Sequence, residues 1–145
     1  MPSAMTSQRW RPVAHVAIGD RGQARSIRDA LHRQGFLVLE HADGLDLVGA
    51  LADLIVERRG WQPQLIVADV RSRGCSGCTI ASGLHELGVT TPVILIANPE
   101  DPVPARDRLW VVEPAIAVQR VPELARRWAP VRILDATFEP ERALA

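Results

Sequence analysis

The stretch Leu65-Ile-Val-Ala-Asp69-Val-Arg-Ser-Arg-Gly74-Cys-Ser-Gly77 decides the fold. Its first four residues are apolar and partly β-branched, which is typical of a strand buried on both faces. Asp69 ends that run, and Ser76 stands where an N-cap would open a helix. Apolar residues then follow at helical spacing: Ile80, Leu84 and Leu87. The stretch therefore predicts a buried strand that leads through a short loop into a helix.

Four more runs of the same kind lie outside this stretch. They are Val13 to Ile18, Phe36 to Leu39, Val93 to Ala97, and Leu109 to Val112. Two of the intervening segments carry apolar residues at helical spacing, Ala24, Ile27 and Leu31 in the first and Leu47, Leu51, Leu54 and Ile55 in the second. Asp20 stands where an N-cap would open the first helix. This alternation of strands and helices predicts an α/β fold with a parallel sheet covered by helices on both faces.

The connection between the last two strands differs from the others. Only 11 residues separate them, and three prolines, Pro99, Pro102 and Pro104, interrupt the segment. Because proline breaks helix interiors, we expect the fourth helix to be shortened or lost. A closing helix is expected around Val121 to Trp128, with Pro122 in its first turn.

Composition excludes several classes of protein. The chain has 145 residues, of which 47% are hydrophobic, and 17 basic residues balance 17 acidic ones. This predicts one globular domain over residues 13–129, with an N-terminal tail at 1–12 and a C-terminal tail at 130–145. No apolar run approaches the roughly 20 residues that span a bilayer, and no signal peptide is evident, so we expect a cytoplasmic protein that does not engage membranes. A net charge of zero argues against direct binding of nucleic acid.

Three acidic residues follow predicted strands. In a doubly wound sheet, ligands bind at the carboxyl ends of the strands. Asp20 follows the first strand, Asp69 the third and Glu113 the fifth, so we expect the three carboxylates to converge in one pocket.

At this point the sequence resembles the receiver domain of two-component response regulators, over about Val13 to Trp128. The stretch from Leu65 to Gly77 resembles the family's phosphoacceptor strand and the Gly-x-Ser-Gly turn after it. Ala42-Asp43-Gly44 resembles the loop after the second strand, and Thr91-Pro92-Val-Ile-Leu-Ile96 resembles the start of the fourth. The resemblance implies a flavodoxin-like sheet with the strand order 2-1-3-4-5.

The resemblance also implies roles for individual residues. Asp69 matches the aspartate that is phosphorylated, and Asp20 matches one of two acids that hold Mg²⁺. The backbone carbonyl of Arg71 matches the third protein ligand. Hard oxygen ligands of this kind suit Mg²⁺, which then bridges a carboxylate to phosphoryl oxygens.

Three positions depart from the family's pattern. Gly19 replaces the second acid of the pair, so we expect Mg²⁺ binding to be weak or vestigial. Ala97 replaces the Ser or Thr that bonds the phosphoryl group. Glu113 replaces the Lys of a Lys-Pro pair, whose peptide bond in the family suggests a cis Glu113–Pro114 bond here. All 17 basic residues are Arg, so no lysine elsewhere can substitute. A reversed charge about 4 Å away would disfavour a phosphorylated Asp69 by several kcal/mol.

Two aromatic residues mark a candidate interaction face. Trp110 matches the family's aromatic switch position, but the hydroxyl that would couple to it is missing at Ala97. Receivers commonly bind partners through their fourth helix, fifth strand and fifth helix, and Trp110 and Trp128 are candidates for that face. Leu124 is a weaker candidate, because core packing explains it more simply.

Other motifs support less. Cys75-Ser-Gly-Cys78 has the spacing of a redox pair, although the receiver resemblance already accounts for the turn. His15 lies inside the first strand, which favours a packed core residue over a ligand. Gly19-Asp-Arg-Gly22 fits neither common nucleotide-binding loop, so no organic cofactor is expected.

The sequence therefore predicts an atypical, stand-alone receiver that is not an enzyme. We expect it to act as a phosphorylation-independent protein-interaction module in bacterial-type signal transduction, with a histidine kinase or a downstream effector as its partner. A homodimer is left open. The alternative is a Mg²⁺-dependent phosphoacceptor receiver that takes phosphate from a histidine kinase on Asp69. A redox switch through Cys75 and Cys78 is a third hypothesis.

Overall fold

The computed structural model describes residues 12–57, 63–71 and 76–129. They form one parallel sheet in the order β2-β1-β3-β4-β5, as predicted. The strands are β1 (Val13–Ala17), β2 (Leu37–Glu40), β3 (Leu65–Asp69), β4 (Val93–Ile96) and β5 (Leu109–Val112). Each strand thus falls within about one residue of its predicted bounds.

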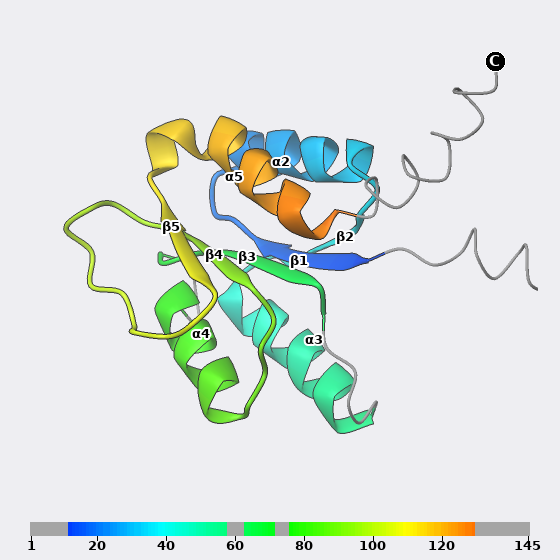
Figure 1. Ribbon diagram of the computed structural model, residues 1–145, viewed down its shortest axis with the longest axis vertical. Coiled ribbons are helices and arrows are strands. Elements are labelled where there is room, and N and C mark those ends of the chain that lie inside the picture. Colours follow the sequence, from blue (N-terminus) through cyan, green and yellow to red (C-terminus); the bar gives the residue numbers. More distant parts are fainter. Residues whose placement is uncertain (1–11, 58–62, 72–75, 130–145) are drawn as a thin grey trace, which may run out of the picture.

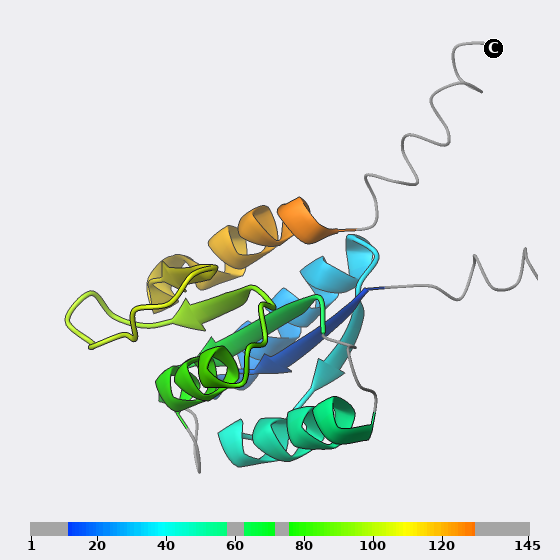
Figure 2. The same cartoon turned by 60° about the horizontal axis from the view of Figure 1, so that its bottom comes forward.

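Helices cover both faces of the sheet (Figures 1 and 2). On one face lie α2 (Arg21–Arg33) and α5 (Ala117–Ala125), and on the other lie α3 (Gly44–Glu57) and α4 (Gly77–Glu86). Two 3₁₀ turns, η1 (Pro114–Ile116) and η2 (Arg126–Trp128), flank α5. None of the helices in the described ranges is both long and apolar enough to cross a membrane.

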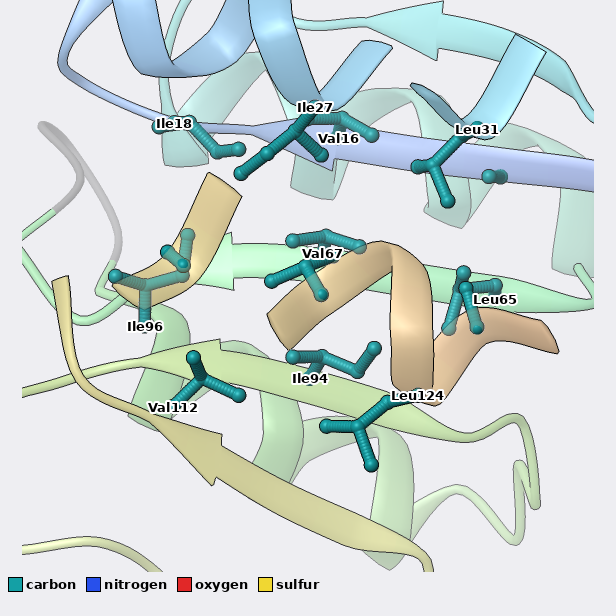
Figure 3. Close-up of a cluster of buried hydrophobic side chains, with 14 of the residues drawn as sticks. Val16, Ile18, Ile27, Leu31, Leu65, Val67, Ile94, Ile96, Val112 and Leu124 are labelled. Carbon is teal, nitrogen blue, oxygen red and sulfur yellow. The ribbon is translucent and has the colours of Figure 1, made fainter. Parts of the chain in front are cut away.

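Two apolar layers hold the helices to the sheet. The layer under α2 and α5 is drawn in Figure 3 and includes Ile27, Leu31 and Leu124, which meet the side chains of four strands. The layer under α3 and α4 is built from Leu47, Leu51, Ile80 and Leu84 against the opposite side of the sheet. Burial of Leu124 confirms it as a core residue rather than part of an exposed face.

The edge strand β2 differs from the expectation of strands buried on both faces. Leu37 is 43% exposed and Leu39 is 39% exposed, whereas Phe36, just before the strand, is fully buried. In the described sheet β2 is an edge strand with β1 as its one neighbouring strand, so an apolar run at this position does not imply full burial.

Local capping signals were predicted correctly. The Asp20 carboxylate accepts a hydrogen bond from the Gln23 backbone N–H, and the Ser76 hydroxyl accepts one from the Thr79 N–H. Each satisfies an N–H at a helix start that has no partner within the helix. The prediction for Leu87 was less accurate, because α4 ends one residue earlier and this side chain is 69% exposed.

The connection between β4 and β5 contains no helix. Residues 97–108 form turns and irregular backbone, so the helix that was expected between β4 and β5 is absent; it is not the helix labelled α4. Arg106 ties this segment to the α4–β4 connection, since its guanidinium donates to the carbonyls of Val89 at 3.0 Å and Thr91 at 3.1 Å. Burial, together with the nearby Arg108, lowers the pKa of Arg106. The half-buried Arg106 side chain thus fastens a segment that a helix would otherwise hold by packing.

Pro122 corrects the predicted start of the closing helix. The helix begins at Ala117, directly after η1, so Pro122 lies in its interior rather than its first turn. Proline there leaves the carbonyl one turn earlier, that of Val118, without its helical N–H partner. The Pro122 carbonyl itself accepts a hydrogen bond from the Gln34 side chain at 2.8 Å, which links α5 to the end of α2. After Ala125 the chain tightens into η2.

His15 is a core residue, as predicted, and it contacts a second histidine. It is fully buried on β1, with its Nδ1 2.9 Å from Nε2 of His41 and the two rings nearly parallel. Burial, with a smaller contribution from the nearby His41, lowers the pKa of His15 to about 4. Burial also lowers the pKa of His41, with Asp46 acting against it.

The buried histidine makes stability depend on pH. Because the folded pKa of His15 lies below its ordinary 6.5, the unfolded chain binds the proton more readily. We expect the free energy of unfolding to be highest above pH 6.5, where His15 is neutral in both states. Up to about 3 kcal/mol of it should be lost as pH falls to about 4. Urea unfolding at several pH values measures this. His15→Leu should flatten the curve and the exposed-site control His85→Gln should not; equal slopes in both variants would contradict the prediction.

Gly77 allows α4 to pack closely on β3. A Cβ at this position would lie 2.7 Å from Cδ2 of Leu95 and 3.0 Å from the carbonyl oxygen of Asp69. Leu95 is fully buried, so it has little room to move. Gly83 lies in the same helix, and a Cβ there would meet nothing within 4 Å.

The two glycines should respond oppositely to alanine. We expect Gly77→Ala to lower the free energy of unfolding by about 1–3 kcal/mol through overpacking. Gly83→Ala should raise it by about 0.5–1 kcal/mol, because alanine has the higher helix propensity. Denaturant unfolding of both variants checks this, and a stable Gly77→Ala protein would refute the close packing.

Candidate functional site

A small pocket lies at the carboxyl ends of the central strands. Its volume is about 180 Å³, and it brings together Asp20 after β1 and Asp69 at the end of β3. The other lining residues come from α2, from the loop after β3, from the end of β4 and its following loop, and from η1: Gln23, Val70, Arg71, Ile96, Ala97, Asn98, Asp101 and Pro114. The structure therefore brings Asp20 and Asp69 to one pocket, as the strand ends predict, and their roles there stay predictions.

Asp20 is held by its role as a helix cap. Its Oδ1 accepts the Gln23 N–H at 2.9 Å, and the Gln23 side chain in turn donates to the carbonyl of Pro114 at 2.8 Å. These two bonds connect the start of α2 to the turn after β5. The exposed carboxylate of Asp20 is thus fixed at one wall of the pocket.

Asp69 is half-buried and oriented by the loop that follows it. Its Oδ1 accepts the backbone N–H of Arg71 at 2.9 Å. A Cβ added at Gly19 would lie 3.8 Å from Oδ2 of Asp69, an ordinary contact distance. Gly19 therefore leaves open the space beside Asp69 into which an acidic side chain at this position would extend, as the resemblance to receivers implies.

Ala97 brings a methyl group into the pocket. It is buried, and its N–H donates to the Val112 carbonyl at 2.9 Å, which fixes it beside the end of β5. A methyl group offers neither a donor nor an acceptor. The position that would bond a phosphoryl group in the family cannot do so through its side chain.

Glu113 corrects the predicted convergence of three carboxylates. It is exposed, and it is not among the residues that line the pocket. The preceding residue, Val112, points into the buried core, and Glu113 already belongs to the turn into η1, so Pro114 reaches the pocket in its place. The Glu113–Pro114 bond is trans, since the described residues include no cis peptide bond. An exposed Glu113 also repels a phosphorylated Asp69 less than the sequence argument assumed.

Asp101 is an acidic pocket residue that the sequence reasoning missed. Its carboxylate accepts the Asn98 N–H at 2.9 Å, and its own N–H donates to the Asn98 carbonyl at 3.0 Å. This closed turn forms in the helix-less connection and brings Asp101 to the pocket wall. The spacing Asn-x-x-Asp after a strand, a common turn signal, could have indicated it.

The donor set of the pocket is made of oxygens. Asp20, Asp69 and the carbonyl of Arg71 are of the type that Mg²⁺ prefers, so the residues present fit that ion. Over the ranges that the structure describes, no three His, Cys, Asp or Glu side chains come together as a metal-binding group. The weak Mg²⁺ binding expected from Gly19 stays a prediction.

Cys78 has the properties of a protonated thiol. It donates to the Pro102 carbonyl at 3.2 Å, and burial, with a further contribution from Asp101, raises its pKa. A thiolate is the reactive form, so this environment disfavours redox chemistry at Cys78. Cys75 lies outside the described residues, and its pairing with Cys78 stays a prediction.

The two candidate face residues contact each other. Trp110 on β5 and Trp128 in η2 pack edge to face with ring centroids 4.9 Å apart, and the guanidinium of Arg127 lies 5.7 Å from the Trp110 ring centroid. Both tryptophans are half-buried against the apolar layer under α2 and α5. They link the fifth strand to the chain after α5.

Comparison with known proteins gives a likeness of structure alone. No protein-family model matches the sequence, and no curated protein does. A response-regulator receiver domain protein from Bacillus halodurans superposes with a TM-score of 0.68 at 12% identity, covering 83% of this chain and 99% of that one.

Two further solved structures agree. The phosphorylated cyanobacterial phytochrome response regulator RcpA matches with a TM-score of 0.62 and 15% identity, over 82% of this chain and 94% of that one. The receiver domain of the hybrid histidine kinase CckA matches with a TM-score of 0.58 and 22% identity, over 80% of this chain and 96% of that one. The chain therefore has the fold of response-regulator receiver domains.

Proposed function

We propose that this chain is an atypical receiver that acts as a phosphorylation-independent protein-interaction module in bacterial-type two-component signalling. The observation that carries the proposal is the pocket around Asp69. The acids Asp20 and Asp69 are in place, but a methyl group stands at Ala97 and Glu113 turns away to solvent. A phosphoryl group on Asp69 would lack both the hydroxyl and the lysine that stabilise it in the family.

The partner surface in this proposal, the β5–α5 surface, is formed by the edge strand β5 and the neighbouring helix α5. Because no helix lies between β4 and β5, Val111 on β5 is 46% exposed, and Val118 on α5 is 41% exposed. The Trp110–Trp128 pair lies at the same edge of the sheet, next to Val111, and would make the surface more rigid. A histidine kinase or a downstream effector in the cytoplasm is the kind of partner proposed, and a second copy of the chain is the other candidate.

A working phosphoacceptor receiver is the second candidate function. Asp20 and Asp69 share one pocket, and the Arg71 side chain lines it as a cation. A guanidinium can pair with phosphoryl oxygens, so Arg71 could replace the missing lysine in part. Mg²⁺ would then be held by Asp20, Asp69 and the Arg71 carbonyl, and it would neutralise charge during transfer to Asp69.

Titration with Mg²⁺ and then beryllofluoride, a phosphoryl mimic, separates the two functions. We expect no saturable change in tryptophan fluorescence or in the amide NMR signals of Asp69 and Ala97, and the same result for Asp69→Asn. The physical reason is the missing hydroxyl and lysine. A saturable change that Asp69→Asn abolishes would overturn the proposal in favour of the phosphoacceptor.

Partner binding should depend on the β5–α5 surface and not on Asp69. We expect Asp69→Asn to retain the proteins that the wild type captures from its native cells, whereas Val111→Glu should lose them, because a charge would be buried at the interface. Leu87→Glu, directly after α4 and 69% exposed, is the matched control outside this surface. Loss of capture in Asp69→Asn with retention in Val111→Glu would count against this assignment.

A further inference from the structure

A polar trough runs beside the pocket, between α2 and the ends of β1 and β2. It consists of two adjoining cavities of about 380 and 370 Å³, which share Ile18, Gly19, Arg21 and Ala42 in their linings. Each has the size of a small-molecule site. The trough adjoins the pocket around Asp69 at Arg71, the one lining residue that the two have in common, and it lies on the β2 side of Gly19, away from Ala97 and Asp101.

Arginines dominate the charge of this trough. Arg21, Arg25 and Arg28 recur on α2 at a spacing that puts them on one face of the helix, and all three line the first cavity. Arg71 joins Arg21 in the lining of the second. Four guanidinium groups thus come from two segments that are far apart in the sequence.

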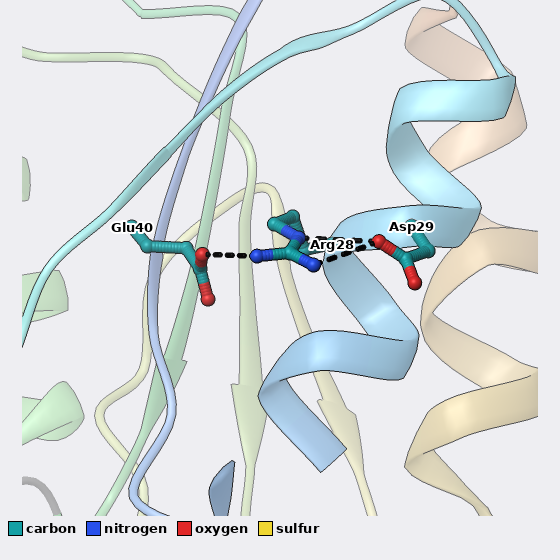
Figure 4. A network of polar contacts seen from close by, with 3 residues as sticks. All are labelled: Arg28, Asp29 and Glu40. Carbon is teal, nitrogen blue, oxygen red and sulfur yellow. Dashed lines mark hydrogen bonds and ion pairs between the residues drawn. The ribbon is translucent and has the colours of Figure 1, made fainter. Parts of the chain in front are cut away.

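Arg28 differs from the other three because its charge is already balanced. Its guanidinium lies 3.1 Å from Asp29 and 3.0 Å from Glu40, and Figure 4 shows it bridging the helix and the end of β2. This bridge secures one end of the trough. Glu40 also lines the cavity, but Arg28 occupies its carboxylate.

Arg21, Arg25 and Arg71 have no such partner. Among the residues that the structure describes, none of these three side chains makes an ion pair or a hydrogen bond. The nearest acid in the lining, Asp43, caps the start of α3 by accepting the Asp46 N–H at 2.9 Å. Three arginines without an ion-pair partner in the described part of the chain therefore line a trough in which Asp43 is the acid that no arginine pairs with.

The rest of the lining suits a small organic ligand. Val16, Ile18 and Ala24 supply apolar surface, and Gly19 and Ala42 keep the passage between the cavities free of large side chains. His41, whose pKa is lowered by burial, adds a neutral ring. Guanidinium groups bind phosphate oxygens through paired hydrogen bonds, and arginines distributed over two cavities match an anion that spreads charge over several oxygens.

We propose that this trough binds a small phosphorylated ligand, of the size of a nucleoside diphosphate, with Arg21, Arg25 and Arg71 on its phosphates. Extended nucleic acid is the less favoured occupant, because the chain has no net charge and the trough is flanked by Glu40 and Asp43. The ligand site requires neither phosphorylation of Asp69 nor a protein partner.

Calorimetric titration with inorganic pyrophosphate and with ADP, in the absence of divalent metal, tests the proposal. We expect saturable binding of at least one probe, with at least a tenfold higher Kd in the double variant Arg21→Gln/Arg25→Gln. Arg33→Gln, an exposed arginine at the end of the same helix, is the matched control and should bind as the wild type does. All substituted side chains are exposed, so the fold should be retained, which circular dichroism checks.

Two further arms identify the site and the ligand class. Asp69→Asn should keep the wild-type Kd, whereas Arg71→Gln should weaken binding. ADP binding more tightly than pyrophosphate would assign the ligand to nucleotides, and the reverse would assign it to simple diphosphates. The proposal is overturned if neither probe binds, if Arg33→Gln loses as much affinity as the double variant, if Asp69→Asn abolishes binding, or if a single-stranded oligonucleotide binds more tightly than both probes.

Discussion

Burial of the central strand β3 on both faces is the constraint on which the rest of the structure depends. Residues 65–68 are all fully buried, with β1 and β4 on either side and a layer of helices above and below. Both neighbours run parallel to β3, so the chain must return over the sheet by a crossover connection between strands. Asp69 is the first residue at which the strand leaves this environment, and its place at the site follows from that.

The connection between β4 and β5, which has no helix, shows what happens at the edge of the sheet, where a strand is no longer covered on both faces. The apolar layer under α3 and α4 ends at β4 and a half-buried Leu109, and Val111 on the outer strand is left 46% exposed. Arg106 holds the connection through hydrogen bonds instead of packing. Hydrogen bonds are directional and local, so the same segment is free to form the Asn98–Asp101 turn beside the pocket.

The sequence predicted features that depend on local chemistry. Strand bounds follow from short apolar runs, and the caps at Asp20 and Ser76 follow from side-chain hydrogen bonding within a few residues. Features that depend on the path of the chain were harder to predict. Pro122 suggested a helix start but lies inside α5, Glu113 turns to solvent, and Asp101 reaches the site through a turn that has no helical pattern.

The trough of arginines combines both kinds of information. The spacing of Arg21, Arg25 and Arg28 was visible in the sequence, but only the fold brings Arg71 to the same surface and pairs Arg28 with Glu40. Since a guanidinium keeps its charge at every physiological pH, the arginines of this surface stay charged over the range in which His15 titrates. His41, which contacts His15, lines the same trough, so the acid-sensitive histidine pair adjoins the arginines.

The glycine at position 77 has a mechanical consequence. No side chain separates the first turn of α4 from the carbonyl of Asp69, so the two backbones are in direct contact. Closely packed atoms resist compression and therefore transmit displacement. A shift of the strand end of a few tenths of an ångström would push the helix as a rigid rod, and its far end, near Leu87 and solvent, would register movement that begins beside Asp69.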